Sequence, residues 1–275
     1  MKSGFYLLAL AGMVFITSCD KDDPIITNDE TCVLLESIWD APNDPSKGIT
    51  EYNYNSAGQL IEIAKADYDL DPTPYNERWT LTYDGNQVSR VNHYTQFRTD
   101  PEDEHEITYF FYENDLVDSI SVDANRPPIT GTYTYKDESY MLLEYSGDKV
   151  VKLTTYLTLT VDNSIVEDVT TLDWTGNNVT KITRLLGGEL VSTIYTYDDK
   201  KRPYRNFTMA FAQTQSLFNL SENNVLSNRY TYAGIMRGSD FTYEYNSDDY
   251  PISSSYTDLA NGWTPPPIVY TYDCK

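Results

Sequence analysis

Histidine, cysteine and positive charge are all scarce in this sequence. Its 275 residues include two histidines and three cysteines, and 20 basic residues stand against 42 acidic ones, for a formal net charge of −22. So acidic a chain offers no basic patch to nucleic acid or to an anionic lipid surface. We therefore expect no nucleic-acid partner, and we interpret the acidity as a means of keeping an exported protein soluble.

The short motifs of common enzymes and cofactor-binding proteins are also missing. The sequence has no HExxH, paired CxxC, P-loop, GxGxxG or GxSxG pattern. Residues 67–71 alternate carboxylates as an EF-hand loop does, but Pro72 and Arg78 stand where glycine and glutamate are needed. We interpret this segment and the acidic run 100–106 as solvated loops, and we predict no catalytic, cofactor or metal residue. Looser calcium binding and a glycosidase carboxylate pair, which only spatial separation defines, stay open.

Long apolar runs are confined to the N-terminus. An apolar stretch from Phe5 to Ile16 follows the single early charge of Lys2. This stretch is shorter than the roughly 20 apolar residues that span a bilayer, and its layout is typical of a secretory signal peptide.

The end of that segment identifies the type of signal. Ile16, Thr17, Ser18 and Cys19 resemble the lipobox of bacterial lipoproteins. The resemblance implies a signal peptide at residues 1–18, acylation of Cys19 (for example with palmitate) and a flexible tether at residues 19–31. The membrane is then a partner through this N-terminal lipid anchor.

The acidic residues 20–23 follow the cysteine directly. They resemble the export signal of surface lipoproteins in gut-type Gram-negative anaerobes, although the enteric sorting scheme would retain such a protein on the inner membrane. We expect a lipid-anchored protein of the outer membrane, on the cell surface, with the periplasmic face as the alternative. Lipidation of Cys19 leaves Cys32 and Cys274 at the two ends of the folded region, where an exported protein can form a disulfide between them. Two free thiols are the alternative.

Tyrosine is abundant, with 25 residues against 9 Phe and 4 Trp, and it recurs in a repeated unit. Each unit has an apolar residue, a spacer, an aromatic or apolar residue, a polar turn and then an aliphatic residue or proline. The residues before and after the polar turn of each unit are Tyr54/Leu60, Tyr83/Val88, Tyr112/Val117, Tyr145/Val150, Trp174/Val179, Tyr197/Pro203, Leu220/Val225 and Tyr245/Pro251. Half-units without such a turn stand at Tyr133–Tyr135, Tyr230–Tyr232 and Tyr270–Tyr272.

This pattern predicts β-hairpins. Residues i and i+2 of a strand share a face, so Tyr-x-Tyr places two rings on one side, and the turn residues Gly, Asn and Asp tolerate positive φ. A hairpin alone is marginally stable in water, so the units must pair into one sheet. With no linker visible, we predict a single all-β domain over residues 32–275.

The repeats are similar to the tyrosine-aspartate repeats of bacterial shell-forming proteins, most clearly at residues 52–60, 195–198 and 270–273. The whole arrangement resembles a family of uncharacterised bacterial lipoproteins with a porin-like β fold. We expect a large antiparallel meander, a closed or flattened barrel of roughly 14–18 strands, filled by large side chains. Charged strands, a C-terminal Tyr-Asp-Cys-Lys and a redundant lipid anchor favour a soluble barrel over a membrane pore.

The sequence does not identify an activity. We favour a surface binding or accessory module for a glycan, a peptide or another envelope protein, with aromatic side chains exposed together on a loop rim. Trp263, before the stiff run Pro265–Pro267, could stack on a sugar or pack within its loop. A structural envelope protein with buried aromatics is the alternative, and a glycan-active hydrolase is a more distant one.

Overall fold

The computed structural model describes residues 32–40, 47–68, 75–97, 102–124, 135–159, 163–186, 188–203, 207–212 and 216–274. The signal peptide expected at residues 1–18, Cys19 and the tether expected at residues 19–31 lie outside this part. The strands are β1 (Cys32–Asp40), β2 (Lys47–Tyr54), β3 (Leu60–Tyr68), β4 (Tyr75–Asp84), β5 (Gln87–Phe97), β6 (Asp103–Glu113), β7 (Leu116–Ala124), β8 (Tyr135–Ser146), β9 (Lys149–Leu159), β10 (Ile165–Thr175), β11 (Asn178–Leu186), β12 (Glu189–Lys201), β13 (Asn223–Tyr232), β14 (Ile235–Tyr245), β15 (Pro251–Asp258) and β16 (Ile268–Cys274). Helix α1 (Phe207–Ala212) and the 3-10 helix η1 (Leu217–Leu220) lie between β12 and β13. Neither is long and apolar enough to cross a membrane.

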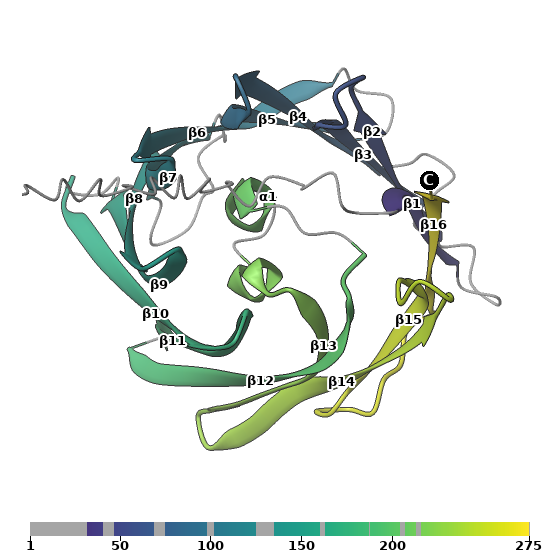
Figure 1. Cartoon of the computed structure of the whole chain (residues 1–275). Coiled ribbons are helices and arrows are strands. Elements are labelled where there is room, and N and C mark those ends of the chain that lie inside the picture. Colours follow the sequence, from purple (N-terminus) through teal and green to yellow (C-terminus); the bar gives the residue numbers. More distant parts are fainter. Residues whose placement is uncertain are drawn as a thin grey trace, which may run out of the picture.

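The strands form one closed barrel. Each strand pairs antiparallel with its neighbours in the chain, and β16 pairs with β1 to close the ring (Figure 1). The predicted all-β antiparallel meander of 14–18 strands is therefore confirmed, and of the two predicted forms the barrel takes the closed one.

The two ends of the barrel differ. We call one the turn end, because tight turns there join β2–β3, β4–β5, β6–β7, β8–β9, β10–β11 and β14–β15. The opposite end, where the other hairpin connections lie, is the loop end. Several tight turns need left-handed backbone, which explains their glycine and asparagine: Gly85 has φ +60° and Asn114 has φ +52°.

A β-bulge at each tight turn explains the spacing of the aliphatic residues. Tyr83 pairs with Val88 while Thr82 pairs with Arg90, so one extra residue is inserted between the two pairs. Val88 and Val91 are therefore both buried on the inner face although they are three residues apart. Equivalent register shifts occur at Tyr54, Tyr112, Tyr145, Trp174 and Tyr245.

Two of the predicted units are wrong. The chain makes no hairpin turn between Tyr197 and Pro203. Tyr197 instead pairs with Val225, the first inward-facing apolar residue of β13. Leu220, predicted as a strand residue, belongs to η1. The intervening chain enters the barrel instead of forming a hairpin.

This inserted segment, which we call the plug (α1 and η1), lies inside the barrel (Figure 1). Met209, Phe211, Leu217 and Leu220 are buried in one core cluster with inward side chains of β3–β11. At the turn end, the amide of Val179 donates to Ser221 Oγ at 3.0 Å and so fixes η1 to the wall. The barrel was expected to be filled by large side chains; the plug supplies part of this filling, and tyrosines such as Tyr52, Tyr83 and Tyr145 pack against the same core.

Candidate functional site

Strand alternation divides the inner wall of β3–β6 into two levels. Near the plug, Ile63, Trp79 and Val91 are buried at 0%, 3% and 1% exposure and belong to the apolar core. One step toward the loop end, the inward positions become polar, with Lys65 on β3 paired across to Glu77 on β4. We call the polar level (Lys65, Asp67, Glu77, His93, His105) the inner polar cluster.

The charged groups of this cluster compensate one another. Lys65 Nζ lies 3.2 Å from Glu77 Oε2 and 3.3 Å from Asp67 Oδ2, and His93 Nε2 lies 3.5 Å from Glu77 Oε1. The contacts with His93 and then Lys65 hold the pKa of the Glu77 carboxyl below its usual value, against the opposing effect of burial. Burial lowers the pKa of Lys65, but Glu77 and Asp67 more than offset it and raise that pKa overall.

Both histidines of the chain take part. The His93 ring stacks on Trp79 with centroids 4.6 Å apart and planes 6° apart, and His105 meets His93 edge-on at 5.5 Å. His93 lies in a strand as predicted. His105, predicted in an acidic loop, lies in β6. It is the extra residue of a β-bulge there, because His93 pairs with Glu106 and Tyr94 pairs with Glu104.

Two polar atoms of this stack are poorly satisfied. Trp79 Nε1 is buried and makes no hydrogen bond within the described residues, and the buried His93 Nε2 has only its 3.5 Å approach to Glu77 Oε1. Buried donors and acceptors are nearly always satisfied in folded proteins, so water or a ligand is needed at this level. The described residues contain no group of three or more His, Cys, Asp or Glu side chains that could hold a metal ion.

The opposite inner wall, formed by β12–β16 with β1 and β2, is lined by tyrosines. Tyr270 shares a hydrogen bond of 2.8 Å with Ser254, and Tyr243 donates to the Val225 carbonyl at 3.0 Å. Burial raises the pKa of Tyr52 to about 12 and also raises that of Tyr243. These hydroxyls therefore remain neutral hydrogen-bonding groups at physiological pH.

An aromatic column continues this wall to the loop end. Phe241 on β14 contacts Tyr256 on β15 with centroids 5.7 Å apart, and the Tyr256 and Trp263 rings form a T-shaped pair with centroids 5.9 Å apart. Trp263 lies in the β15–β16 connection and is 54% exposed. Of the two readings of Trp263 left open by the sequence, the structure favours an exposed ring over a packed one.

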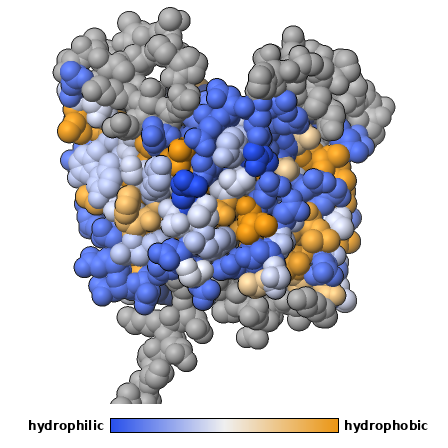
Figure 2. All heavy atoms as spheres, turned by 90° about the horizontal axis from the view of Figure 1, so that it is seen from above, coloured by the Kyte–Doolittle hydropathy of each residue, from blue (hydrophilic) through white to orange (hydrophobic). Residues whose placement is uncertain are grey.

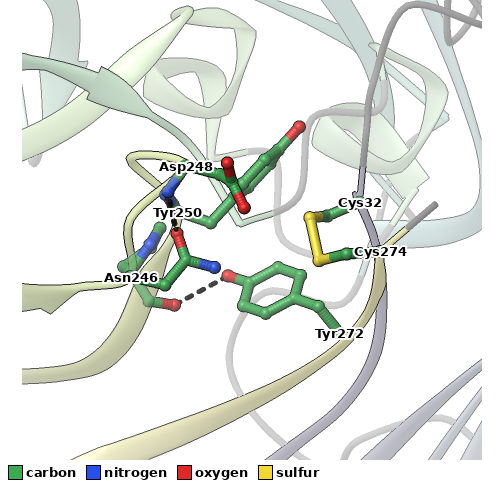
Figure 3. Close-up of a disulfide and its surroundings, with 7 residues drawn as sticks. Cys32, Asn246, Asp248, Tyr250, Tyr272 and Cys274 are labelled. Atoms are coloured by element: carbon green, nitrogen blue, oxygen red, sulfur yellow. Dashed lines mark hydrogen bonds between the residues drawn. A yellow bond between two sulfur atoms is a disulfide. The ribbon is translucent and has the colours of Figure 1, made fainter.

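The turn end carries the cysteine pair. Cys32 on β1 is in register with Cys274 on β16, and their sulfurs are bonded at 1.99 Å. In Figure 3 the bridge lies beside the Tyr272 ring, whose hydroxyl donates to the Pro251 carbonyl at 2.8 Å. Both chain ends of the barrel are thus joined at the end that holds η1.

The two acidic segments lie only partly within the described residues. Asp67 ends up beside Lys65 on β3, and residues 69–71 lie outside the described part. Residues 103–106, predicted as loop, form the start of β6. Glu102 is bound by Arg78 through two hydrogen bonds, of 2.8 and 2.5 Å. These carboxylates are paired across strands, which single-sequence reasoning could not see.

Comparison with known proteins identifies the fold alone. Neither a protein-family model nor any curated protein matches the chain. Among solved structures, it is similar to a porin-like protein from Bacteroides uniformis, with a TM-score of 0.58 and 11% identity over 88% of this chain and 96% of that one. It is also similar to a porin-like protein from Bacteroides vulgatus, with a TM-score of 0.55 and 10% identity over 88% and 98%. The chain thus has a porin-like β-barrel fold.

Proposed function

We propose that this protein is a lipid-anchored envelope barrel that acts as a binding module, with its ligand-binding side at the loop end. The porin-like fold supports an envelope location, and the lipobox at Cys19 supports the anchor. The observation that carries the proposal is the difference between the two ends. The turn end holds η1 and the disulfide, whereas the loop end presents an exposed aromatic ring on one wall and a polar inner surface on the opposite wall.

The polarity of the outer wall supports a barrel that stands in water rather than in lipid. Arg78 on β4 reaches both Glu62 on β3 and Glu102, and Lys152 bonds Glu144 between β9 and β8. Successive side chains of a strand point to opposite faces of the barrel wall, and in β4, β8 and β9 this alternation places Arg78, Glu144 and Lys152 on the outside. A Lys or Arg facing lipid near the bilayer midplane costs about 2–4 kcal/mol. The wall facing the viewer in Figure 2 is mostly hydrophilic, with hydrophobic residues gathered near its centre and on its right side.

The tether sets the orientation. Cys32 is at the turn end, and the 13 residues from Cys19 to Cys32 span at most about 45 Å when extended. The anchor would therefore hold the turn end toward the membrane and leave the loop end directed away from it. A binding surface at the loop end is then the one that meets external molecules.

Anchoring is tested by comparing the wild-type chain with Cys19→Ala in cell fractions and detergent partition. We expect the variant to leave the membrane fraction as an unprocessed precursor. An epitope inserted between Ala233 and Gly234, at the loop end, should bind antibody on intact cells, and replacement of residues 20–23 by alanine should reduce that signal. If antibody binds only after permeabilisation, the periplasmic alternative holds.

The structural-protein alternative makes a different prediction. Loss of a structural envelope protein should sensitise cells to detergent and chelator, whereas loss of a binding module should leave this barrier intact. We expect an intact barrier in a deletion strain. Sensitivity that the wild-type gene restores would contradict the binding-module assignment.

A further inference from the structure

We propose that the loop end binds a neutral saccharide on the exposed face of Trp263, with Asp258 and Asn261 as its polar partners. This inference rests on the proposed function and deepens it by naming the site and the class of ligand. All four tryptophans of the chain lie in the described part, and they differ in exposure. Trp79 is buried, Trp39 and Trp174 are half-buried, and Trp263 alone is exposed, at 54%.

The backbone that carries the exposed ring is held in place. The Trp263 carbonyl accepts from the Asp258 amide at 2.8 Å, and the Trp263 amide donates to Asn261 Oδ1 at 2.8 Å. Gly262 N donates to the Asp258 carbonyl at 2.8 Å, and three prolines follow at residues 265–267. A loop backbone that is already ordered in the free protein loses little entropy when a ligand binds on it.

The edge-to-face contact with Tyr256 supports one side of the ring. Tyr256 and Phe241 continue the aromatic surface down the inner wall toward the plug. A sugar ring presents C–H groups on its faces and hydroxyls around its edge. An aromatic surface flanked by a few polar groups complements both.

The polar partners lie in the same loop. Asp258 Oδ1 accepts from the Ala260 amide at 2.7 Å and Asn261 Oδ1 accepts from the Trp263 backbone amide at 2.8 Å, so the second Asp258 oxygen and the Asn261 amide nitrogen are the atoms offered to a ligand. Thr257 and Thr264 share a hydroxyl contact of 3.0 Å at the base of the loop. Carboxylate, amide and hydroxyl groups are the partners that sugar hydroxyls require.

The charge of the chain restricts the class of saccharide. With a net charge of −22, the protein repels uronates and sulfated sugars, which leaves neutral ones. A peptide is less well accommodated, because the closed barrel leaves for strand addition only the short stretch of β15 beyond Ser254, where its pairing with β16 stops.

The test uses the purified full-length chain in native gels that contain starch, laminarin, mannan or xylan, with polygalacturonate as the acidic comparison. We expect retardation by at least one neutral polysaccharide and none by polygalacturonate. Trp263→Ala should weaken that binding at least about tenfold, because it removes most of the stacking area. Trp263→Phe should retain part of it.

Val269→Ala is the matched control, since Val269 is 50% exposed on the outer wall of the neighbouring strand. It should bind like the wild type, and the melting temperatures of all three variants should agree, because none of the substituted side chains is buried. Retardation by no neutral polysaccharide, retardation by polygalacturonate alone, or unchanged binding by Trp263→Ala would each overturn the proposal. Surface display and barrier integrity are measured separately, so a peptide- or protein-binding module would survive such a failure.

Discussion

At the scale of the residue, one hydrogen bond recurs around the barrel. An aromatic side chain near the turn end of each even-numbered strand donates to a backbone carbonyl at the start of the strand before it, at 2.6–3.1 Å. The pairs are Tyr54–Leu34, Tyr83–Leu60, Tyr112–Val88, Tyr145–Val117, Trp174–Val150, Tyr197–Val179, Tyr243–Val225 and Tyr272–Pro251. The backbone ladder between β3 and β4 stops at Glu62–Thr80, so the Tyr83 hydroxyl bridges the gap beyond it. The repeated tyrosine is thus a hydrogen-bonding residue as well as an apolar one.

Tyr83→Phe tests this role. The substitution keeps the ring and removes the hydroxyl, which leaves the Leu60 carbonyl without that donor, and we expect a loss of about 1 kcal/mol of unfolding free energy. Tyr140→Phe is the control, because Tyr140 is 41% exposed on the outer wall. Urea denaturation measures both, and equal stability of Tyr83→Phe and the wild type would contradict the bridging role.

Glu77 gives a second prediction at this scale, concerning pH. Because its folded-state pKa is lowered, the ionised carboxylate stabilises the fold above the unfolded pKa of about 4.3 and loses that effect as pH falls through the folded value. Lys65 and Asp67 from β3, and His93 and His105 from β5 and β6, are the charged or titratable groups around it.

We therefore expect Glu77→Gln to be less stable than the wild type at pH 7, by about 1 kcal/mol, with the difference shrinking below about pH 4. Glu144→Gln is the control, because the Glu144 side chain is 61% exposed. Denaturation midpoints from pH 3 to 7 measure the effect. A constant difference across this range would mean that Glu77 acts through its shape and not its charge.

At the scale of the element, the plug replaces a hairpin turn. Phe211 is 2% exposed and packs within the core cluster, so Phe211→Ala leaves a cavity and should cost about 3–5 kcal/mol. Phe111→Ala is the matched control, because Phe111 is 51% exposed on the outer wall, and it should cost little. Calorimetric melting compares the two; similar small losses would mean that the barrel holds without the plug.

The plug is also the part of the fold that could not be predicted from the sequence. Strands were predictable from the alternation of aromatic and polar residues, and six of the eight predicted units turn where expected. The run Phe218-Asn219-Leu220 has that pattern and is followed by a polar turn-like run, yet tertiary contacts override it. Arg202 donates to the Phe218 carbonyl at 3.0 Å, and the Tyr195 ring stacks on Phe218 at 5.6 Å. Such contacts join residues far apart in sequence and leave no local signal.

The inner polar cluster was hidden for a related reason. His93 was correctly placed in a strand, but its contacts with Trp79 and His105 depend on which residues of β4, β5 and β6 face one another. A bulge shifts that register by one residue and moves a side chain to the other face. The sequence shows the composition of the strands, whereas the site is a property of their register.

At the scale of the whole molecule, the barrel consists of eight units of two paired strands, and the unit formed by β16 and β1 has no connecting turn. Tyr272 pairs with Leu34 as Tyr83 pairs with Val88, and a register shift follows each pair. Where six of the other units have a tight turn and one has the plug, Cys274 meets Cys32. The disulfide therefore takes the place of a peptide connection and encloses a sequence separation of 242 residues.

The bridge is the last prediction. Cys32→Ser with Cys274→Ser should lower the unfolding free energy by about 5 kcal/mol in the chain-entropy model, because the unfolded chain regains the freedom of that long loop. A second variant should recover most of this loss: residues 32–274 of the double serine variant are cyclised through a short Gly-Asn linker between the two serines, so that the unfolded chain is again a closed loop. Denaturation of the three chains, with mass spectrometry of the non-reduced wild type, measures both effects. Free cysteine peptides after oxidising purification, or a cyclised chain no more stable than the double serine variant, would show that strand pairing alone closes the barrel.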